Sequence, residues 1–274
     1  MEQLIENMDV SPKSKNVYLS LLKRLEREEF KIPMKTPQRE TYIKDFFGEK
    51  FEKISTRLDM LNLIIILRKA VDMKIDKLVE YRNELVKLRL ETNIQTLNDK
   101  KKDLITLGEF EECLDTFYRQ KNYKGYIVNY LWSRYGVRNK DVDVEIVKRK
   151  QDVKNDKNYL YLVKGRVEYI RNDYKTKPTY GVKRHLIVDE KFIEMVKSHG
   201  VGKVLEGSQI GNALRKLMIK GMGEADIFKV LIADCYDRED TERVNELSFT
   251  RGTNVNTIKA FYDVNAKKEI IREI

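Results

Sequence analysis

The sequence predicts a mainly α-helical protein with a small antiparallel sheet, in which an all-helical N-terminal domain precedes an α+β C-terminal domain. Two patterns of apolar residues predict this class. They recur at helical spacing over residues 14–90, and again from residue 189 to the end of the chain. Between residues 142 and 187 they alternate with polar residues at a period of two, which is typical of half-buried strands.

The N-terminal domain is expected over residues 1–96 as a bundle of four or five helices. Ser11-Pro12 is a start signal for the first of them. One of the later segments is apolar nearly all round, so it is expected to be buried. The segments with helical spacing cover residues 14–30, 36–48, 55–71 and 74–90.

The C-terminal domain is expected over residues 97–274, after a polar stretch at 91–102 that we interpret as the linker. Thr106 and Glu109 form a capping-box pattern that opens a new helix. Helices are expected over about 107–119 and 123–135, then three or four short antiparallel strands, then more helices.

The composition favours a polyanionic partner. The 274 residues include 54 Lys and Arg against 44 Asp and Glu, a net charge of +10, and the pI is about 9.3. Residues 1–97 hold 19 basic and 16 acidic side chains, and the remainder holds 35 and 28, so both domains are basic. A two-domain clamp around DNA would need this distribution, although a basic protein without such a partner fits the composition equally well.

Several other classes of protein and site are not expected. Two cysteines, Cys113 and Cys235, give no disulfide framework and no CxxC spacing, and two histidines are too few for a zinc site. The longest apolar run, residues 63–67, is far short of a membrane span, and the N-terminus resembles no signal peptide. We therefore expect no metal, no cofactor and no membrane association. The expected location is cytoplasmic, or associated with the nucleus or nucleoid, and not secreted.

Four short segments carry side chains suited to phosphate chemistry. Each segment also has a plainer interpretation, as a surface arginine, a solvated basic turn or a tyrosine packed in the core. A guanidinium binds two phosphate oxygens at once, a lysine can donate a proton, and a tyrosine can act as a nucleophile. In chain order the segments are Gly136-Val137-Arg138, residues 173–177 with Lys175 and Lys177, Gly211-Asn212-Ala213-Leu214-Arg215, and residues 250–262, which end at Tyr262.

These segments, in this order and on these expected elements, resemble the tyrosine recombinases, which include the phage-type integrases. The resemblance spans nearly the whole chain and is sharpest over residues 131–262. It implies a core-binding N-terminal domain and a catalytic C-terminal domain of the tyrosine-recombinase type. The implied activity is site-specific recombination or integration, by cleaving and rejoining DNA through a 3′-phosphotyrosyl intermediate.

The resemblance also implies a role for each side chain. Arg138 and Arg215 would hold the scissile phosphate, and Tyr262 would be the nucleophile. Lys175, with Lys177 as the fallback, would protonate the departing 5′ oxygen. The implied partner is double-stranded DNA, on which the protein would form a homotetramer through its tail, residues 263–274. No small-molecule substrate is implied, and the many Lys, Ile and Asn residues suggest a virus or mobile element.

Two departures from the family pattern leave alternatives open. Asn212 stands where the family has a histidine, and it can donate a hydrogen bond but cannot shuttle a proton. The last segment contains no His or Trp, so Arg251 is expected to supply the missing donor, with Thr253 the other nearby polar residue. A relative with a decayed site, kept for DNA binding or structure, is one alternative. Others are a type IB topoisomerase-like enzyme and an unrelated basic nucleic-acid-binding module.

Overall fold

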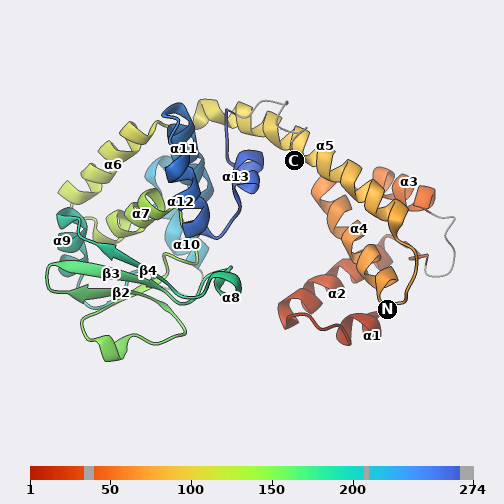
Figure 1. Cartoon of the computed structure of the whole chain (residues 1–274), viewed down its shortest axis with the longest axis horizontal. Coiled ribbons are helices and arrows are strands. Elements are labelled where there is room, and N and C mark those ends of the chain that lie inside the picture. Colours follow the sequence, from red (N-terminus) through yellow and green to blue (C-terminus); the bar gives the residue numbers. More distant parts are fainter. Residues whose placement is uncertain (34–39, 207–209, 266–274) are drawn as a thin grey trace. The chain divides into compact units, whose positions relative to one another are not determined.

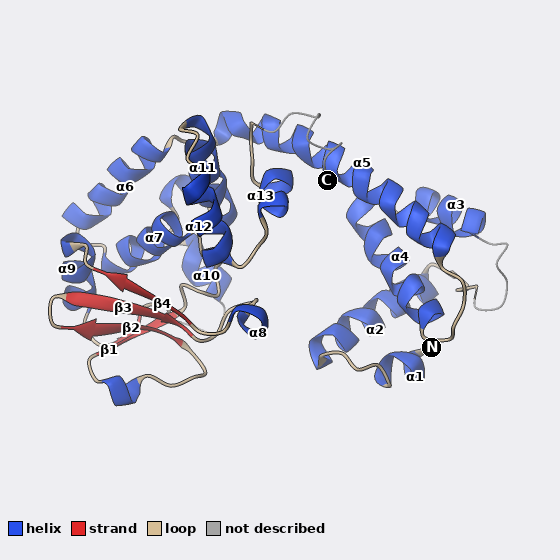
Figure 2. Cartoon of the chain, in the orientation of Figure 1, coloured by secondary structure: helices blue, strands red, loops and turns tan. Residues whose placement is uncertain are grey.

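A computed structural model of the chain describes residues 1–33, 40–206 and 210–265 (Figure 1). The chain is mainly helical with one small sheet, as the sequence predicts (Figure 2). It divides into two compact units, of which the first is Met1–Asn93 and the second begins at Ile94. No helix in the described ranges is both long enough and apolar enough to cross a bilayer.

The first unit is all-helical over its described residues. Ser11 caps the second helix by accepting a hydrogen bond from the backbone nitrogen of Ser14 at 3.2 Å, so the predicted start signal is correct. Leu25, Phe47 and Leu61 are among the residues of its buried core. Its helices are α1 (Glu2–Glu6), α2 (Pro12–Arg27), α3 (Glu40–Lys50), α4 (Ile54–Lys69) and α5 (Asp76–Lys100).

The predicted linker at residues 91–102 is helical rather than irregular, because α5 continues through it to Lys100, and the boundary between the two units, at Asn93 and Ile94, lies within it. Ile94 and Leu97 are both buried. Since residues three apart share a helical face, these two side chains give the polar segment an apolar side to bury. A single turn of 3-10 helix, Lys101–Asp103, follows.

The second unit combines helices with the sheet. Its first helix begins with the predicted capping box, in which Thr106 and Glu109 exchange hydrogen bonds of 3.2 and 2.8 Å. The helices are α6 (Leu107–Arg119), α7 (Tyr123–Tyr135), the short α8 (Lys177–Tyr180), α9 (Glu190–His199), α10 (Ile210–Arg215), α11 (Glu224–Asp237), α12 (Thr241–Arg251) and α13 (Val255–Phe261).

The sheet has the strand order β4-β3-β2-β1-β5 and is mixed rather than purely antiparallel. β1 pairs with β2 in parallel, whereas the other pairs are antiparallel. The connection over residues 148–157 explains the parallel pair. It carries the chain back to the end of the sheet at which β1 began, so β2 runs in the same direction as β1, whereas a hairpin would reverse the direction. The strands are β1 (Val144–Val147), β2 (Asn158–Val163), β3 (Arg166–Arg171), β4 (Lys183–Ile187) and β5 (Gly202–Lys203).

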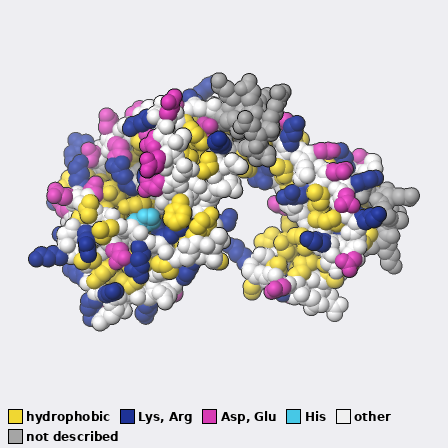
Figure 3. All heavy atoms as spheres, viewed as in Figure 1, with side chains coloured by type: hydrophobic (Ala, Val, Ile, Leu, Met, Phe, Trp, Pro, Cys, Tyr) yellow, Lys and Arg dark blue, Asp and Glu magenta, His cyan; other side chains and the backbone are white. Residues whose placement is uncertain are grey.

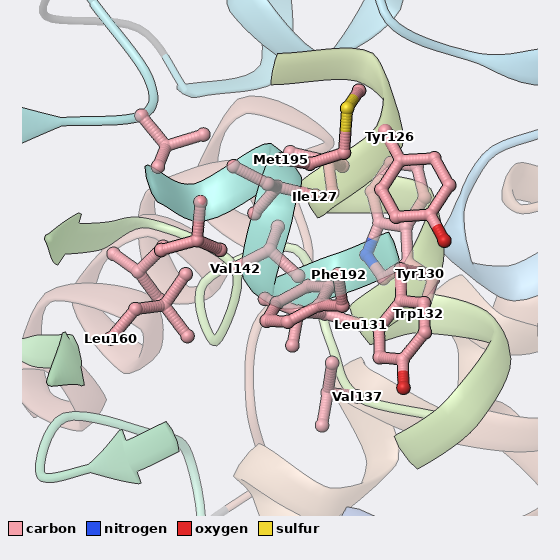
Figure 4. Close-up of a cluster of buried hydrophobic side chains, with 14 of the residues drawn as sticks. Tyr126, Ile127, Tyr130, Leu131, Trp132, Val137, Val142, Leu160, Phe192 and Met195 are labelled. Atoms are coloured by element: carbon pink, nitrogen blue, oxygen red, sulfur yellow. The ribbon is translucent and has the colours of Figure 1, made fainter. Parts of the chain in front are cut away.

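The main core of the second unit lies around α7. This helix is buried over most of its length, and Figure 4 shows Tyr130 and Trp132 close to Phe192 of α9. The rings of Tyr130 and Phe192 are 4.3 Å apart at their centroids. Burial of several aromatic rings on one helix fixes the position of its C-terminal end, and the first predicted site segment begins there.

Candidate active site

The chain after α7 places Arg138 beside the ends of two later helices. Gly136 follows α7, and a side chain there would lie 2.7 Å from the ring of Phe228 on α11, so only glycine allows this close approach. Val137 is buried, and Arg138 next to it is half-buried. The Arg138 Nη1 atom donates to the carbonyl oxygen of Arg251 at 2.5 Å, a contact between residues 113 positions apart. The predicted first and fourth segments therefore meet.

Arg251, the last residue of α12, is buried and held on several sides. Its Nη1 atom donates to the Gly136 carbonyl at 2.7 Å, and its Nη2 atom forms a short ion pair with Glu224. Its guanidinium lies 4.2 Å from the centroid of the Phe228 ring and 5.0 Å from that of the Tyr262 ring. Cation–π contacts of this kind are strongest where water is excluded. Arg251 therefore connects α11, α12 and the chain after α13.

Tyr262 follows α13, and its hydroxyl lies within hydrogen-bonding distance of the Arg251 guanidinium. Asn254 caps the start of α13, and its side chain accepts from the Thr257 backbone nitrogen at 2.7 Å. The Nη2 atom of Arg251 donates to the Tyr262 hydroxyl at 3.3 Å, and Tyr262 is half-buried. Its ring meets Phe228 edge-on at 4.8 Å between centroids. The ring packs against Phe228 while the hydroxyl accepts from a guanidinium, an arrangement suited to a nucleophilic phenol.

Only the Nη1 atom of the Arg138 side chain donates a hydrogen bond to a described residue. Burial lowers the pKa of Arg138, and the neighbouring Arg251 guanidinium lowers it further, against the opposing effects of Asp141, Tyr262 and Glu224. Among the described residues nothing accepts a hydrogen bond from its Nε or Nη2 atom. A half-buried guanidinium with an open edge, next to a second guanidinium, is a favourable place for an anion.

Sequence reasoning missed a buried ion pair that supports this arrangement. Arg171 at the end of β3 is paired with Asp141, and both side chains are fully buried. Arg171 also donates to the Thr250 carbonyl in α12 at 2.6 Å. A signal was present, because Val167, Tyr169 and Arg171 alternate onto the buried face of β3. A charged residue such as Arg171 on this buried face indicates a buried residue of opposite charge to pair with it.

Lys183 at the start of β4 was also missed. It is buried, and its ammonium donates to the Phe249 carbonyl and, at 3.3 Å, to the Thr250 carbonyl. Burial lowers the pKa of Lys183 to about 8, with a further lowering from Arg171 and Arg138 that Asp141 partly offsets. The residues joined by these contacts form what we call the tyrosine cluster: Arg138, Asp141, Arg171, Lys183, Glu224, Arg251 and Tyr262.

The tyrosine cluster contains four cations but only two carboxylates, Asp141 and Glu224. An excess of partly buried positive charge is stabilised by an anion, and a phosphodiester fits the planar guanidinium groups. No group of three or more His, Cys, Asp or Glu side chains that could hold a metal ion occurs within residues 1–33, 40–206 and 210–265. The four cations of the tyrosine cluster are suited to stabilising charge on a phosphate.

The predicted lysine segment lies against the turn that carries Arg251. A side chain at Gly252 would overlap the hydroxyl of Thr176, which stands between Lys175 and Lys177. Lys177 donates to the Asn155 carbonyl at 3.1 Å, whereas Lys175 is exposed and makes no hydrogen bond or ion pair with any described residue. Lys175 is thus the freer of the two predicted general acids.

The third predicted segment is not joined to the tyrosine cluster. Asn212 and Arg215 lie on α10, and both side chains are exposed. Arg215 forms no hydrogen bond or ion pair with the part of the chain that is described. Only Leu214, between them, is buried in the core. The structure therefore brings together Arg138, Arg251 and Tyr262, and leaves Asn212 and Arg215 exposed to solvent.

Comparisons with known proteins give little further guidance. No protein-family model matches the chain, and no curated protein matches it. Among solved structures, the crystal structure of XerA recombinase aligns with 98% of this chain and 94% of its own, at 11% sequence identity and a TM-score of 0.38. This likeness is too low to identify a shared activity, so a function has to be argued from the chain's own geometry.

Proposed function

We propose that this protein cleaves and rejoins DNA with Tyr262 as its nucleophile, as a site-specific recombinase or integrase. The observation that carries the proposal is the hydrogen bond from the buried Arg251 guanidinium to the Tyr262 hydroxyl, with the Arg138 guanidinium bound to the carbonyl of the same Arg251. Arg138 comes from the first predicted segment and the other two residues from the fourth, and the Nε and Nη2 atoms of Arg138, from which no described residue accepts, are open to a phosphate. A tyrosine packed only for stability has no need of a buried guanidinium at its hydroxyl.

The chemistry follows from these groups. The Tyr262 oxygen attacks phosphorus as the phenol passes its proton to solvent water, and the bond from phosphorus to the 5′ oxygen breaks. The leaving oxygen takes up a proton, for which exposed Lys175 is the proposed donor. Arg138 and Arg251, with Arg215 brought in by the bound DNA, offset the charge on the phosphate. The 3′-phosphotyrosyl bond keeps the energy of the broken linkage, so the reverse attack rejoins the strand without a cofactor.

The proposal includes the remaining parts of the chain. Residues 1–96 would form the core-binding domain and residues 97–274 the catalytic domain. On the face shown in Figure 3, Lys and Arg side chains alternate with Asp and Glu, so the net charge of +10 does not by itself mark a DNA-binding face. The tetramer expected on DNA would use the tail at 263–274, of which residues 266–274 lie outside the described residues.

Trapping the covalent intermediate tests this function. The full-length protein is incubated with a random-sequence pool of nicked duplexes, in which the short downstream fragment that carries the new 5′ hydroxyl diffuses away and rejoining is prevented. Denaturing electrophoresis then separates protein joined to DNA, and the attached strands are sequenced to find the target. We expect an adduct with the wild type, none with Tyr262→Phe, and an undiminished adduct with the control Tyr161→Phe, a half-buried tyrosine of β2. An adduct that persists in Tyr262→Phe would contradict the proposal.

The exposed third segment favours one other function, a DNA-binding protein of this kind whose cleavage activity has decayed. Arg215 and Asn212 do not join the tyrosine cluster, and Asn212 cannot shuttle a proton. Specific binding of a selected duplex, without adduct on any nicked or supercoiled form of it, would support this function. Relaxation of supercoiled plasmid without exchange between two sites would instead indicate a topoisomerase-like enzyme.

A further inference from the structure

The C-terminal end of α12 is held by basic side chains to an unusual degree. The last carbonyl groups of a helix have no partner within the helix. Here the Phe249 carbonyl accepts from Lys183, the Thr250 carbonyl accepts from both Lys183 and Arg171, and the Arg251 carbonyl accepts from Arg138. Three consecutive carbonyls are thus bound by three cations from three other segments. Positive charge at this end also complements the helix dipole.

Lys183 is enclosed by aromatic rings as well. Its ammonium lies 4.3 Å from the centroid of the Phe249 ring, 4.7 Å from that of Tyr180 and 5.4 Å from that of Tyr174. The Tyr180 and Phe249 rings meet edge-on at 6.0 Å. Cation–π attraction to three rings and hydrogen bonds to two carbonyls restrain this side chain from several directions. A lysine so restrained costs desolvation and conformational entropy, which stability alone does not explain.

We infer that Lys183 is a positioning residue, which fixes the end of α12 so that Arg251 presents its guanidinium to the Tyr262 hydroxyl. The inference rests on the proposed function for its consequence in catalysis. Lys183 binds the carbonyls of the two residues directly before Arg251, so a shift of this turn moves the Arg251 guanidinium away from the phenol. It also moves the Arg251 carbonyl, on which Arg138 depends.

The role of Lys183 can be tested by substitution, because the Phe249 and Thr250 carbonyls keep other hydrogen-bond donors when its ammonium is removed. The Phe249 carbonyl also accepts from the Gly252 backbone nitrogen at 3.0 Å, and the Thr250 carbonyl keeps its bond to Arg171. Lys183→Met retains the length of the aliphatic chain and removes the charge and the donors. Lys183→Arg restores both. Lys191→Met is the matched control, because Lys191 also lies over a tyrosine ring, that of Tyr118 at 5.4 Å, and pairs with a carboxylate on another helix.

The first experiment compares adduct formation with DNA binding on the selected duplex. A displacement of about 1 Å at a residue remote from the chemistry can cost roughly 100-fold in rate. For Lys183→Met we expect a loss of that order in the rate constant at saturating DNA, an affinity within about twofold of the wild type, and partial recovery in Lys183→Arg. Lys191→Met should match the wild type. A weaker affinity with an unchanged rate constant at saturation would overturn the inference.

The second experiment does not depend on cleavage. 3-Fluorotyrosine is placed at position 262 of the full-length protein, and its ¹⁹F resonance is recorded for the wild type and for each Lys183 variant. A shifted or broadened resonance in Lys183→Met, restored in Lys183→Arg, supports the positioning role even if the wild type forms no adduct and the proposed function fails. If Lys183→Met does not fold, the same comparison is made with Lys183→Gln and Lys183→Arg. An unchanged resonance in every folded variant would overturn the inference.

Discussion

The tyrosine cluster and the exposed segment on α10 represent two ways of holding a functional cation. In the tyrosine cluster, Arg251 is buried among Gly136, Glu224 and the rings of Phe228 and Tyr262. On α10, Arg215 is exposed and bonds to none of the described residues. Arg215 was predicted to hold the scissile phosphate and Arg251 to supply the donor missing from the last segment, but the fold fixes only Arg251 in advance.

The contrast shows which part of the proposed site is built by folding and which part would depend on a ligand. Buried cations need carbonyl and carboxylate partners, and those partners fix the geometry before DNA arrives. An exposed arginine keeps its rotamer freedom in the free protein and loses this conformational entropy only when it binds a ligand. Variants of the first kind should therefore change stability, and variants of the second kind should change activity alone.

The largest expected effect is on stability, at the buried pair beneath the tyrosine cluster. Arg171→Met leaves the Asp141 carboxylate buried without its counter-charge, and breaking a buried pair in this way costs about 3–5 kcal/mol. Chemical denaturation should show that loss of the free energy of unfolding. Arg184→Met on the adjacent strand removes an exposed pair with Glu168, for which about 0–1 kcal/mol is expected. Equal losses in the two variants would contradict the contrast between buried and exposed cations.

The next effect is on catalysis. Arg138→Ala removes a preorganised donor from the phosphate site, a change that costs about 100–1000-fold in rate. Arg215→Ala should reduce adduct formation by a similar factor, but its stability should stay within about 0.5 kcal/mol of the wild type because its side chain is exposed. Single-turnover trapping and thermal unfolding measure the two quantities. Full activity in Arg215→Ala would remove Arg215 from the site, and Lys216→Ala, at the next exposed position, serves as the control.

A smaller effect on stability is expected at Gly252, where residues 175–177 lie against the turn that follows Arg251. Gly252 has a φ of +65°, and a side chain there would also overlap Thr176. Gly165 in the β2–β3 turn has a φ of +76° with open space around it, so Gly165→Ala isolates the backbone strain of roughly 1–2 kcal/mol. Gly252→Ala should destabilise the protein more than Gly165→Ala in thermal unfolding. The opposite order would mean that residues 175–177 do not pack on this turn.

A last effect is a dependence of stability on pH. Burial lowers the pKa of Lys183 in the folded state from 10.5 to about 8. Between these pH values the unfolded chain binds more protons at this residue than the folded chain, so its contribution to stability rises with pH. The difference in unfolding free energy between the wild type and Lys183→Met should therefore grow from pH 8 to about 10.5 in favour of the wild type. A constant difference would contradict the lowered pKa.

Much of the fold could be predicted from local patterns. Helical spacing, the Ser11 cap and the Thr106–Glu109 capping box located their helices, because each signal acts over a few residues. Two features were missed for the same physical reason. Ile94 and Leu97 make the expected linker part of α5, and β1 pairs in parallel with β2. Both depend on which surfaces are available for burial, and this information is not local.

The sequence by itself determined the chemistry available to this protein: Arg138, Arg251 and Tyr262 as side chains suited to a phosphate, and a basic composition without a metal-ligand pattern in the printed residues. Only the tertiary structure decided which of those side chains meet. It joined residues 138, 251 and 262 through the ends of α7, α12 and α13. It also added Arg171 and Lys183, because buried charges must find partners wherever the folded chain supplies them.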